Sequence, residues 1–196
     1  MYEVEIKFPV TDTRAVESRL AGLNAAFHQP IEQVDRYFAH PSRDFARTDE
    51  ALRLRRDGDA VVITWKGPRI DAATKTRREI ELPLGASPPQ RGDVFHPAEL
   101  AIERWTELLE ALGFRPVATV AKRRRPARVA WQGREVDVVL DRVTGLGDFL
   151  EVELQAVEAD VPAARSCLES LAEALGCGPS ERRSYLELLL ESRAKR

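Results

Sequence analysis

YEVEIKFP, residues 2–9, alternates strictly between apolar and charged side chains until Pro9 ends the run. The charged side chains of this stretch are those of Glu3, Glu5 and Lys7. A period of two residues is that of a β-strand, in which successive side chains point to opposite faces. The stretch therefore predicts a strand with one apolar face and one ionic face.

The same alternation recurs in segments far along the chain. Charged residues occupy every second position in four of them: Arg53 and Arg55; Arg77, Glu79 and Glu81; Lys122 and Arg124; Glu151 and Glu153. One interpretation is that each ionic stripe faces solvent, as in an ordinary half-solvated antiparallel sheet. Exposed faces usually mix Ser, Thr, Gln and Lys, however, whereas these stripes group carboxylates on some strands and Arg or Lys on others. We therefore expect the stripes to turn inward and helices to cover the apolar faces.

Nine segments have strand-like patterns, and they are interrupted by a few amphipathic helical patterns. The expected strands are 2–9, 31–39, 51–57, 60–66, 77–84, 117–125, 127–132, 134–141 and 148–156. Helices are expected after the capping residues at 11–13, over 97–112 and 162–175, and after a cap at Ser180. Asp57-Gly58-Asp59 and Gln132-Gly133 predict tight turns. The strand count reaches eight or nine, and we expect an α+β fold, a closed antiparallel eight-stranded β-barrel with flanking helices, in one domain over residues 1–196.

The overall composition limits the class of protein. With 196 residues, 43% of them hydrophobic and 32% charged, the chain has the make-up of one packed globular domain. It has no apolar run of about 18 residues and no signal-peptide pattern, so we expect a cytoplasmic protein that does not engage membranes. Its 30 Lys and Arg against 32 Asp and Glu argue against nucleic acid as a partner.

Ionic side chains that turn inward need partners, because an unpaired buried ion costs several kcal/mol to desolvate. Carboxylates bind Mg²⁺ or Mn²⁺ through hard oxygen ligands, and Arg and Lys neutralise phosphate oxygens. Grouped acids and grouped bases therefore favour a polyanionic ligand that is bound together with metal ions.

Glu3-Val4-Glu5-Ile6-Lys7 matches the ExExK signature of the CYTH proteins, also called triphosphate tunnel metalloenzymes, and the rest of the chain resembles them in order. The other matching motifs are Asp35-Arg36-Tyr37-Phe38, Ala51-Leu52-Arg53-Leu54-Arg55, Arg77 to Glu81, Lys122-Arg123-Arg124, Leu140-Asp141, and Leu146 to Glu153. Trp65-Lys66-Gly67-Pro68 and the ending Ser184 to Leu189 look most like the class IV adenylyl cyclase branch.

The resemblance implies a role for each of these positions. It implies metal ligation by Glu3, Glu5, Glu151 and Glu153, assisted by Glu79 and Glu81. It implies triphosphate binding by Lys7, Arg53, Arg55, Lys66, Arg77, Lys122 and Arg124. Glu5, Lys7 and Asp141 are implied as catalytic residues.

The implied activity is metal-dependent turnover of a small-molecule triphosphate, ATP or polyphosphate, with Mg²⁺ or Mn²⁺ as the cofactor. A class IV adenylate cyclase would convert ATP to cyclic AMP and pyrophosphate. One alternative is a triphosphatase that hydrolyses tripolyphosphate, thiamine triphosphate or a nucleoside triphosphate, and another is a non-catalytic binder of nucleotide or polyphosphate. The Leu-rich stretch 186–190 is interpreted as a packing helix or, alternatively, as a homodimer interface.

Overall fold

The computed structural model describes residues 2–69, 77–84 and 97–195, whose strands form one sheet that closes on itself. The hydrogen-bonded order is β2-β7-β3-β4-β5-β6-β1-β9-β8, and a further pairing joins β7 to β8. Because β2 is a two-residue addition to β7, eight strands make up the closed ring. The predicted eight-stranded antiparallel barrel with helices is confirmed.

The strands have the following bounds: β1 (Tyr2–Val10), β2 (Ala26–Phe27), β3 (Ile31–Ala39), β4 (Ala51–Asp57), β5 (Ala60–Arg69), β6 (Arg77–Pro83), β7 (Arg115–Trp131), β8 (Arg134–Val143) and β9 (Gly147–Ala156). The helices are α1 (Thr13–Gly22), α2 (Phe45–Thr48), α3 (Pro97–Ala111), α4 (Val161–Ala174) and α5 (Tyr185–Ala194), with a 3₁₀ turn at Glu158–Asp160. Among the helices of the described residues, none has both the length and the apolar character needed to cross a membrane.

The chain forms two compact units. Unit 1 comprises Met1–Pro30, Arg69–Arg78 and Lys122–Arg196, and unit 2 comprises Ile31–Pro68 and Glu79–Ala121. Neither unit is a continuous segment of chain, and a single domain over residues 1–196 stays a prediction.

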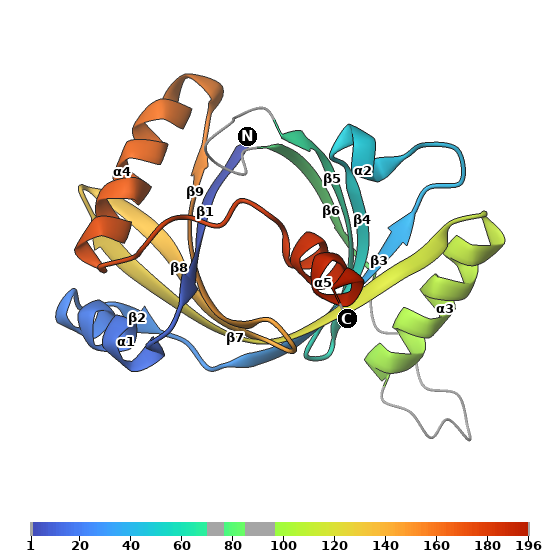
Figure 1. Cartoon of the computed structure of the whole chain (residues 1–196), viewed down its shortest axis with the longest axis horizontal. Coiled ribbons are helices and arrows are strands. Elements are labelled where there is room, and N and C mark those ends of the chain that lie inside the picture. The colour runs from blue at the N-terminus through green and yellow to red at the C-terminus, as the bar shows by residue number, and fades with distance from the viewer. Residues whose placement is uncertain (1, 70–76, 85–96, 196) are drawn as a thin grey trace. The chain divides into compact units, whose positions relative to one another are not determined.

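In unit 1, one face of the sheet carries the hydrophobic core. Val4 lies opposite Leu154, and Val152 lies between Ile6 and Val138, so the apolar positions of neighbouring strands share a face. Helices α1 and α4 contribute apolar side chains to this core, and α4 packs beside β1 and β9 (Figure 1). The charged positions of the same strands must then lie on the other face.

Unit 2 repeats this arrangement with a different helix. Phe38, Leu52 and Leu54 lie on one face of β3 and β4, where they form a core with the buried side chains of α3. Those α3 side chains are Ala98, Ala101, Ile102 and Leu109. The opposite face of these strands carries the alternating charged residues.

Two predicted turns are confirmed by their backbone geometry. Gly58 turns the chain between β4 and β5 with a φ of 57°, a conformation that glycine adopts without strain. Gln132 and Gly133 join β7 to β8 with φ values of 46° and 74°, as a type I′ hairpin turn requires.

Two expected element boundaries are wrong. The strands predicted at 117–125 and 127–132 are one strand, β7, since Pro126 remains extended opposite Val139 and its carbonyl accepts the amide of His28. The last helix is capped by Ser184 rather than Ser180. Ser184 forms a capping box with Glu187, which satisfies two free amides at the start of α5.

Leu168→Ala should destabilise the protein by about 2–5 kcal/mol, because the side chain of Leu168 is fully buried in the α4 core. Chemical denaturation would measure this loss. Leu190→Ala is the matched control, since Leu190 in α5 is 39% exposed and should change stability by less than about 1 kcal/mol. Equal losses in the two variants would contradict the assignment of the α4 face to the core.

Candidate functional site

The ionic face of unit 1 brings four strands, β1, β9, β8 and β7, together through their register. Glu5 lies directly opposite Glu153, and Lys7 lies opposite Glu151. On the neighbouring pair of strands, Arg124 lies opposite Asp141. Side chains at directly paired positions point to the same face, so the alternation in the sequence creates one continuous ionic surface.

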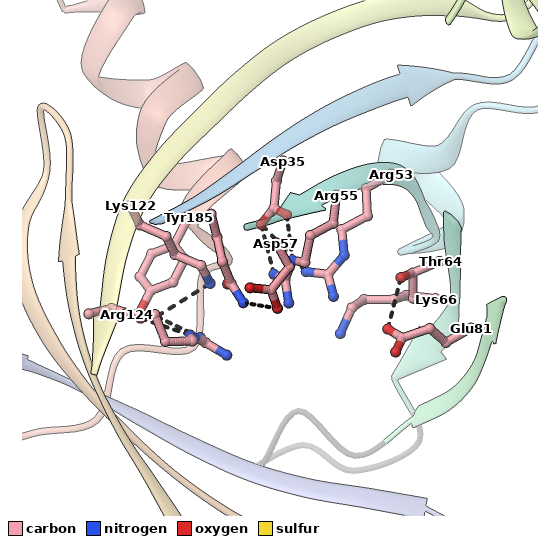
Figure 2. Close-up of polar contacts among 12 residues, drawn as sticks. Asp35, Arg53, Arg55, Asp57, Thr64, Lys66, Glu81, Lys122, Arg124 and Tyr185 are labelled. Atoms are coloured by element: carbon pink, nitrogen blue, oxygen red, sulfur yellow. Dashed lines mark hydrogen bonds and ion pairs between the residues drawn. The ribbon is translucent and has the colours of Figure 1, made fainter. Parts of the chain in front are cut away.

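Asp141 is the centre of the hydrogen bonds on this face. Its carboxylate accepts two bonds from Arg124, at 2.8 and 2.6 Å, and one from Lys122 at 3.3 Å. The Tyr185 hydroxyl also donates to this carboxylate, at 3.1 Å. Figure 2 shows Tyr185, Lys122 and Arg124 close together. Arg124 also donates to Glu151 at 2.6 Å, so one guanidinium holds two carboxylates.

These charges are buried. Lys7 is 1% exposed, Asp141 is 2% exposed and Lys122 is 4% exposed, which is unusual for ionised residues unless they are paired. Burial alone would lower the pKa of Arg124, but the carboxylates of Asp141 and Glu151 outweigh it and raise that pKa well above its ordinary value. Arg124 therefore remains a fixed cation.

The chain segment before α5 is anchored to Lys7. The Lys7 ammonium donates to the carbonyl of Arg183 at 2.5 Å, and the amide of Glu181 donates to the carbonyl of Lys7 at 2.7 Å. The guanidinium of Arg183 hydrogen-bonds the Glu181 carboxylate and lowers its pKa to about 2. The C-terminal segment is thus tied directly to the first strand.

Glu3, Glu5 and Glu153 form the acidic part of unit 1. Burial, and then the carboxylates of Glu3 and Glu5, raise the pKa of Glu153 to about 8. A carboxyl group is shifted in this direction where negative charges gather in a poorly solvated place. A cation at this position would relieve their repulsion.

Unit 2 presents its own ionic face. The buried Asp35 accepts two hydrogen bonds from Arg55, at 2.6 and 2.8 Å, and pairs with Arg53 at 3.6 Å. Figure 2 shows both guanidinium groups beside this carboxylate. The Nε atom of Arg53 is buried and has no hydrogen-bond partner within the described part of the chain. The Asp35 and Tyr37 side chains raise the pKa of Arg53 above its ordinary value despite burial, which by itself would lower it.

Further polar pairs continue this face toward β6. Lys66 is paired with Glu79, and Thr64 donates to Glu81 at 3.1 Å. Gln33 donates to Asp57 at 2.9 Å at the other end of β3.

The donor set of unit 1 suits a hard divalent cation. Carboxylate oxygens are the ligands that Mg²⁺ and Mn²⁺ prefer, and the raised pKa of Glu153 reports an excess of negative charge there. In residues 2–69, 77–84 and 97–195, no three His, Cys, Asp or Glu side chains are already grouped closely enough to hold a metal ion. Metal binding would therefore require these carboxylates to draw together.

The structure places the predicted site residues on the two ionic faces. Unit 1 contains Glu3, Glu5, Lys7, Arg77, Lys122, Arg124, Asp141, Glu151 and Glu153, and unit 2 contains Arg53, Arg55, Lys66, Glu79 and Glu81. Arg77 is buried and lies opposite Glu3. Glu79 and Glu81, expected as metal ligands, interact with Lys66 and Thr64 of their own unit. The roles assigned to all of these residues stay predictions.

Sequence reasoning gave no role to Asp35 or Tyr185. Asp35 was part of a recognised motif, and its even spacing from Tyr37 on β3 was a signal that it shares a face with the arginines of β4. Tyr185 lay within the recognised ending Ser184 to Leu189, but no spacing placed it on the ionic face, because its neighbours there are distant in the sequence.

Comparison with known proteins gives consistent matches over most of the chain. The family model described as "CYTH domain" matches residues 1–185. A protein of Methanocaldococcus jannaschii named "Putative adenylate cyclase" is 34% identical, covering 96% of this chain and 98% of that protein. The solved structure of the PH1819 protein from Pyrococcus horikoshii is 39% identical, with a TM-score of 0.79, covering 97% of this chain and 99% of that one.

A plant protein shares the fold at lower identity. The Hippeastrum protein, described as a "putative adenylyl cyclase" with a dominant triphosphatase activity, is 16% identical with a TM-score of 0.59, and the match covers 98% of this chain and 95% of that one. At this identity the likeness concerns the fold alone.

In metal-free buffer, Glu153→Gln should remove a pH-dependent loss of stability. Because the pKa of Glu153 is about 8 in the folded protein and about 4.3 in an unfolded chain, the folded state binds more protons between these values. Stability should therefore fall as the pH rises from about 5 to 8, by up to about 1.4 kcal/mol per pH unit from this group. Denaturant titrations at several pH values would measure the slope.

Because glutamine does not titrate, the free energy of unfolding of the variant should equal that of the wild type near pH 5 and exceed it near pH 8. Adding Mn²⁺ at pH 8 should stabilise the wild type more than the variant. Parallel stability curves over this range would show that Glu153 does not lie in a repulsive acidic cluster.

Proposed function

Because this chain belongs to the CYTH domain family, we propose that it is a divalent-metal-dependent enzyme acting on a triphosphate, and specifically that it converts ATP to cyclic AMP and pyrophosphate. The observation that carries the proposal is that each unit buries a face of mixed charge whose cations are held by carboxylates rather than by solvent. The finer assignment to cyclisation is supported by the name of the M. jannaschii relative.

Each ionic face offers cations suited to phosphate oxygens. Unit 2 supplies Arg53, Arg55 and Lys66, and unit 1 supplies Lys7, Lys122 and Arg124. A guanidinium presents a rigid fork of donors that matches a phosphate, whereas an ammonium acts as a compact charge. The buried Nε atom of Arg53 is a donor without a partner in the described residues, and a phosphate oxygen would satisfy it.

Acidic partners keep these cations in place before a ligand arrives. Asp35 orients Arg55 through two hydrogen bonds, and Asp141 orients Arg124 in the same way. Donors that are already oriented need not reorganise when charge develops on a transferring phosphoryl group. The carboxylates thus contribute to catalysis indirectly, by fixing the position of the positive charges.

Glu3, Glu5 and Glu153 are the residues that would hold the metal in unit 1, with Glu151 beside them on β9. A divalent ion bound there would supply charge neutralisation and activation of the attacking hydroxyl. In cyclisation the ribose 3′-hydroxyl attacks the α-phosphate, and pyrophosphate departs with its negative charge. Arginine and lysine side chains that bind the departing oxygens would stabilise this charge.

Product identification separates cyclisation from hydrolysis. Purified protein is incubated with ATP, tripolyphosphate or thiamine triphosphate, in Mg²⁺ or Mn²⁺ and with excess chelator as the control. Cyclic AMP and pyrophosphate from ATP, abolished by the chelator, are the expected result. Orthophosphate would identify a triphosphatase, and binding without turnover would identify a non-catalytic binder; either would overturn the proposed cyclisation.

Arg55→Ala should raise the KM for the triphosphate at least about tenfold, since it removes one partly buried cation that is proposed to bind phosphate. Arg56→Ala is the matched control, because Arg56 is adjacent on β4 but lies opposite Val34 and Val61, on the apolar face. Its KM should stay within about threefold of the wild type. Steady-state kinetics measures both, and equal effects in the two variants would contradict the division of β4 into two faces.

A further inference from the structure

We propose that Tyr185 is a positioning residue, whose ring holds the lysine cations of unit 1 in the arrangement that binds the triphosphate. The inference rests on the proposed function and assigns a part to a residue outside the strands that carry the charges. Tyr185 is the first residue of α5 and is buried against the ionic face.

Two ammonium groups lie close to the Tyr185 ring. The Nζ atom of Lys7 is 4.1 Å from the ring centroid, and that of Lys122 is 5.1 Å from it. Both distances fall within the range in which an aromatic ring attracts a cation, and the attraction is stronger where water is excluded. A single ring therefore restrains lysines that come from two different strands, β1 and β7.

The hydroxyl of Tyr185 acts on the same group of residues. It donates to the Asp141 carboxylate, which also accepts from Lys122 and Arg124. Burial, followed by the carboxylates of Glu151 and Asp141, raises the pKa of Tyr185 well above its ordinary value, so the phenol stays a neutral donor. The ring thus contacts Lys7 and Lys122, and the hydroxyl contacts Asp141.

The position of the ring is itself fixed from several sides. The capping box of Ser184 and Glu187 sets the start of α5, and Phe149 packs edge-to-face against Tyr185 with ring centroids 5.0 Å apart. The bonds between Lys7 and the 181–183 segment hold the chain immediately before the ring. Lysine has many rotamers, and a fixed aromatic surface reduces this freedom before the ligand binds.

A purely structural role would make Tyr185 a hydrophobic cover for the ionic face. Leucine tests this alternative, because it keeps an apolar side chain but has no aromatic face for the ammonium groups. Phenylalanine is the matched control, since it keeps the ring and removes only the hydroxyl bond to Asp141.

The experiment compares Tyr185→Leu with Tyr185→Phe in the full-length protein. Tyr185→Leu should raise the KM for ATP about tenfold or more and leave kcat within about threefold, because the lost restraint acts on binding. Tyr185→Phe should keep the KM within about threefold. Equal KM values for both variants and the wild type, at equal thermal stability, would reduce Tyr185 to a packing residue and overturn the inference.

A spectroscopic measurement on the wild type needs neither catalysis nor a stable leucine variant. With ¹³C-labelled lysine, the ε-methylene protons of Lys122 should be shifted upfield by the ring current of Tyr185, and Tyr185→Phe should retain this shift. Lys122 signals at ordinary positions would overturn the inference.

Tripolyphosphate binding, measured by calorimetry, distinguishes failure of the positioning role from failure of the proposed function. If the wild type turns over no triphosphate, the proposed function fails, yet a weaker affinity in Tyr185→Leu than in Tyr185→Phe still supports the positioning role. Equal affinities in the two variants would contradict that role even in an active enzyme.

Discussion

A buried ion is stable only if other charges or dipoles replace the water that it loses, and this constraint governs both units of the protein. Asp35 and Asp141 are almost completely buried and each is bound by arginine. Removing either partner would leave an uncompensated charge, so the acids and bases stabilise one another as groups. The result is a pair of rigid ionic faces rather than a set of mobile surface side chains.

The alternation of the β-strand allows one segment to serve two purposes. The even positions of β1 anchor it to the core under α1 and α4, while its odd positions carry Glu3, Glu5 and Lys7. The helices that cover the apolar face therefore stabilise the ionic face indirectly, by fixing the strands. In unit 1 the C-terminal segment adds a second support from the ionic side, through Lys7 and Tyr185.

The alternation of charged and apolar residues predicted most strands of the barrel and the shared faces of the candidate residues, but it missed the two-residue strand β2. It could not predict pairings that depend on distant segments, such as the contact of Tyr185 with Asp141 across 44 positions of sequence. The break expected at Pro126 was wrong because proline is compatible with an extended strand, and its effect depends on which neighbour its nitrogen faces. Ser180 and Ser184 are both good caps locally, and the capping box with Glu187 distinguishes them.

The most direct test of the account is a crystal structure with Mn²⁺ and a non-hydrolysable ATP analogue, in which anomalous scattering locates the metal. The account predicts manganese in contact with the Glu153 carboxylate and phosphate oxygens in contact with the guanidinium groups of the ionic faces. Manganese and phosphate bound elsewhere, with the Asp35 and Asp141 ion pairs unaltered and no ligand beside them, would contradict it.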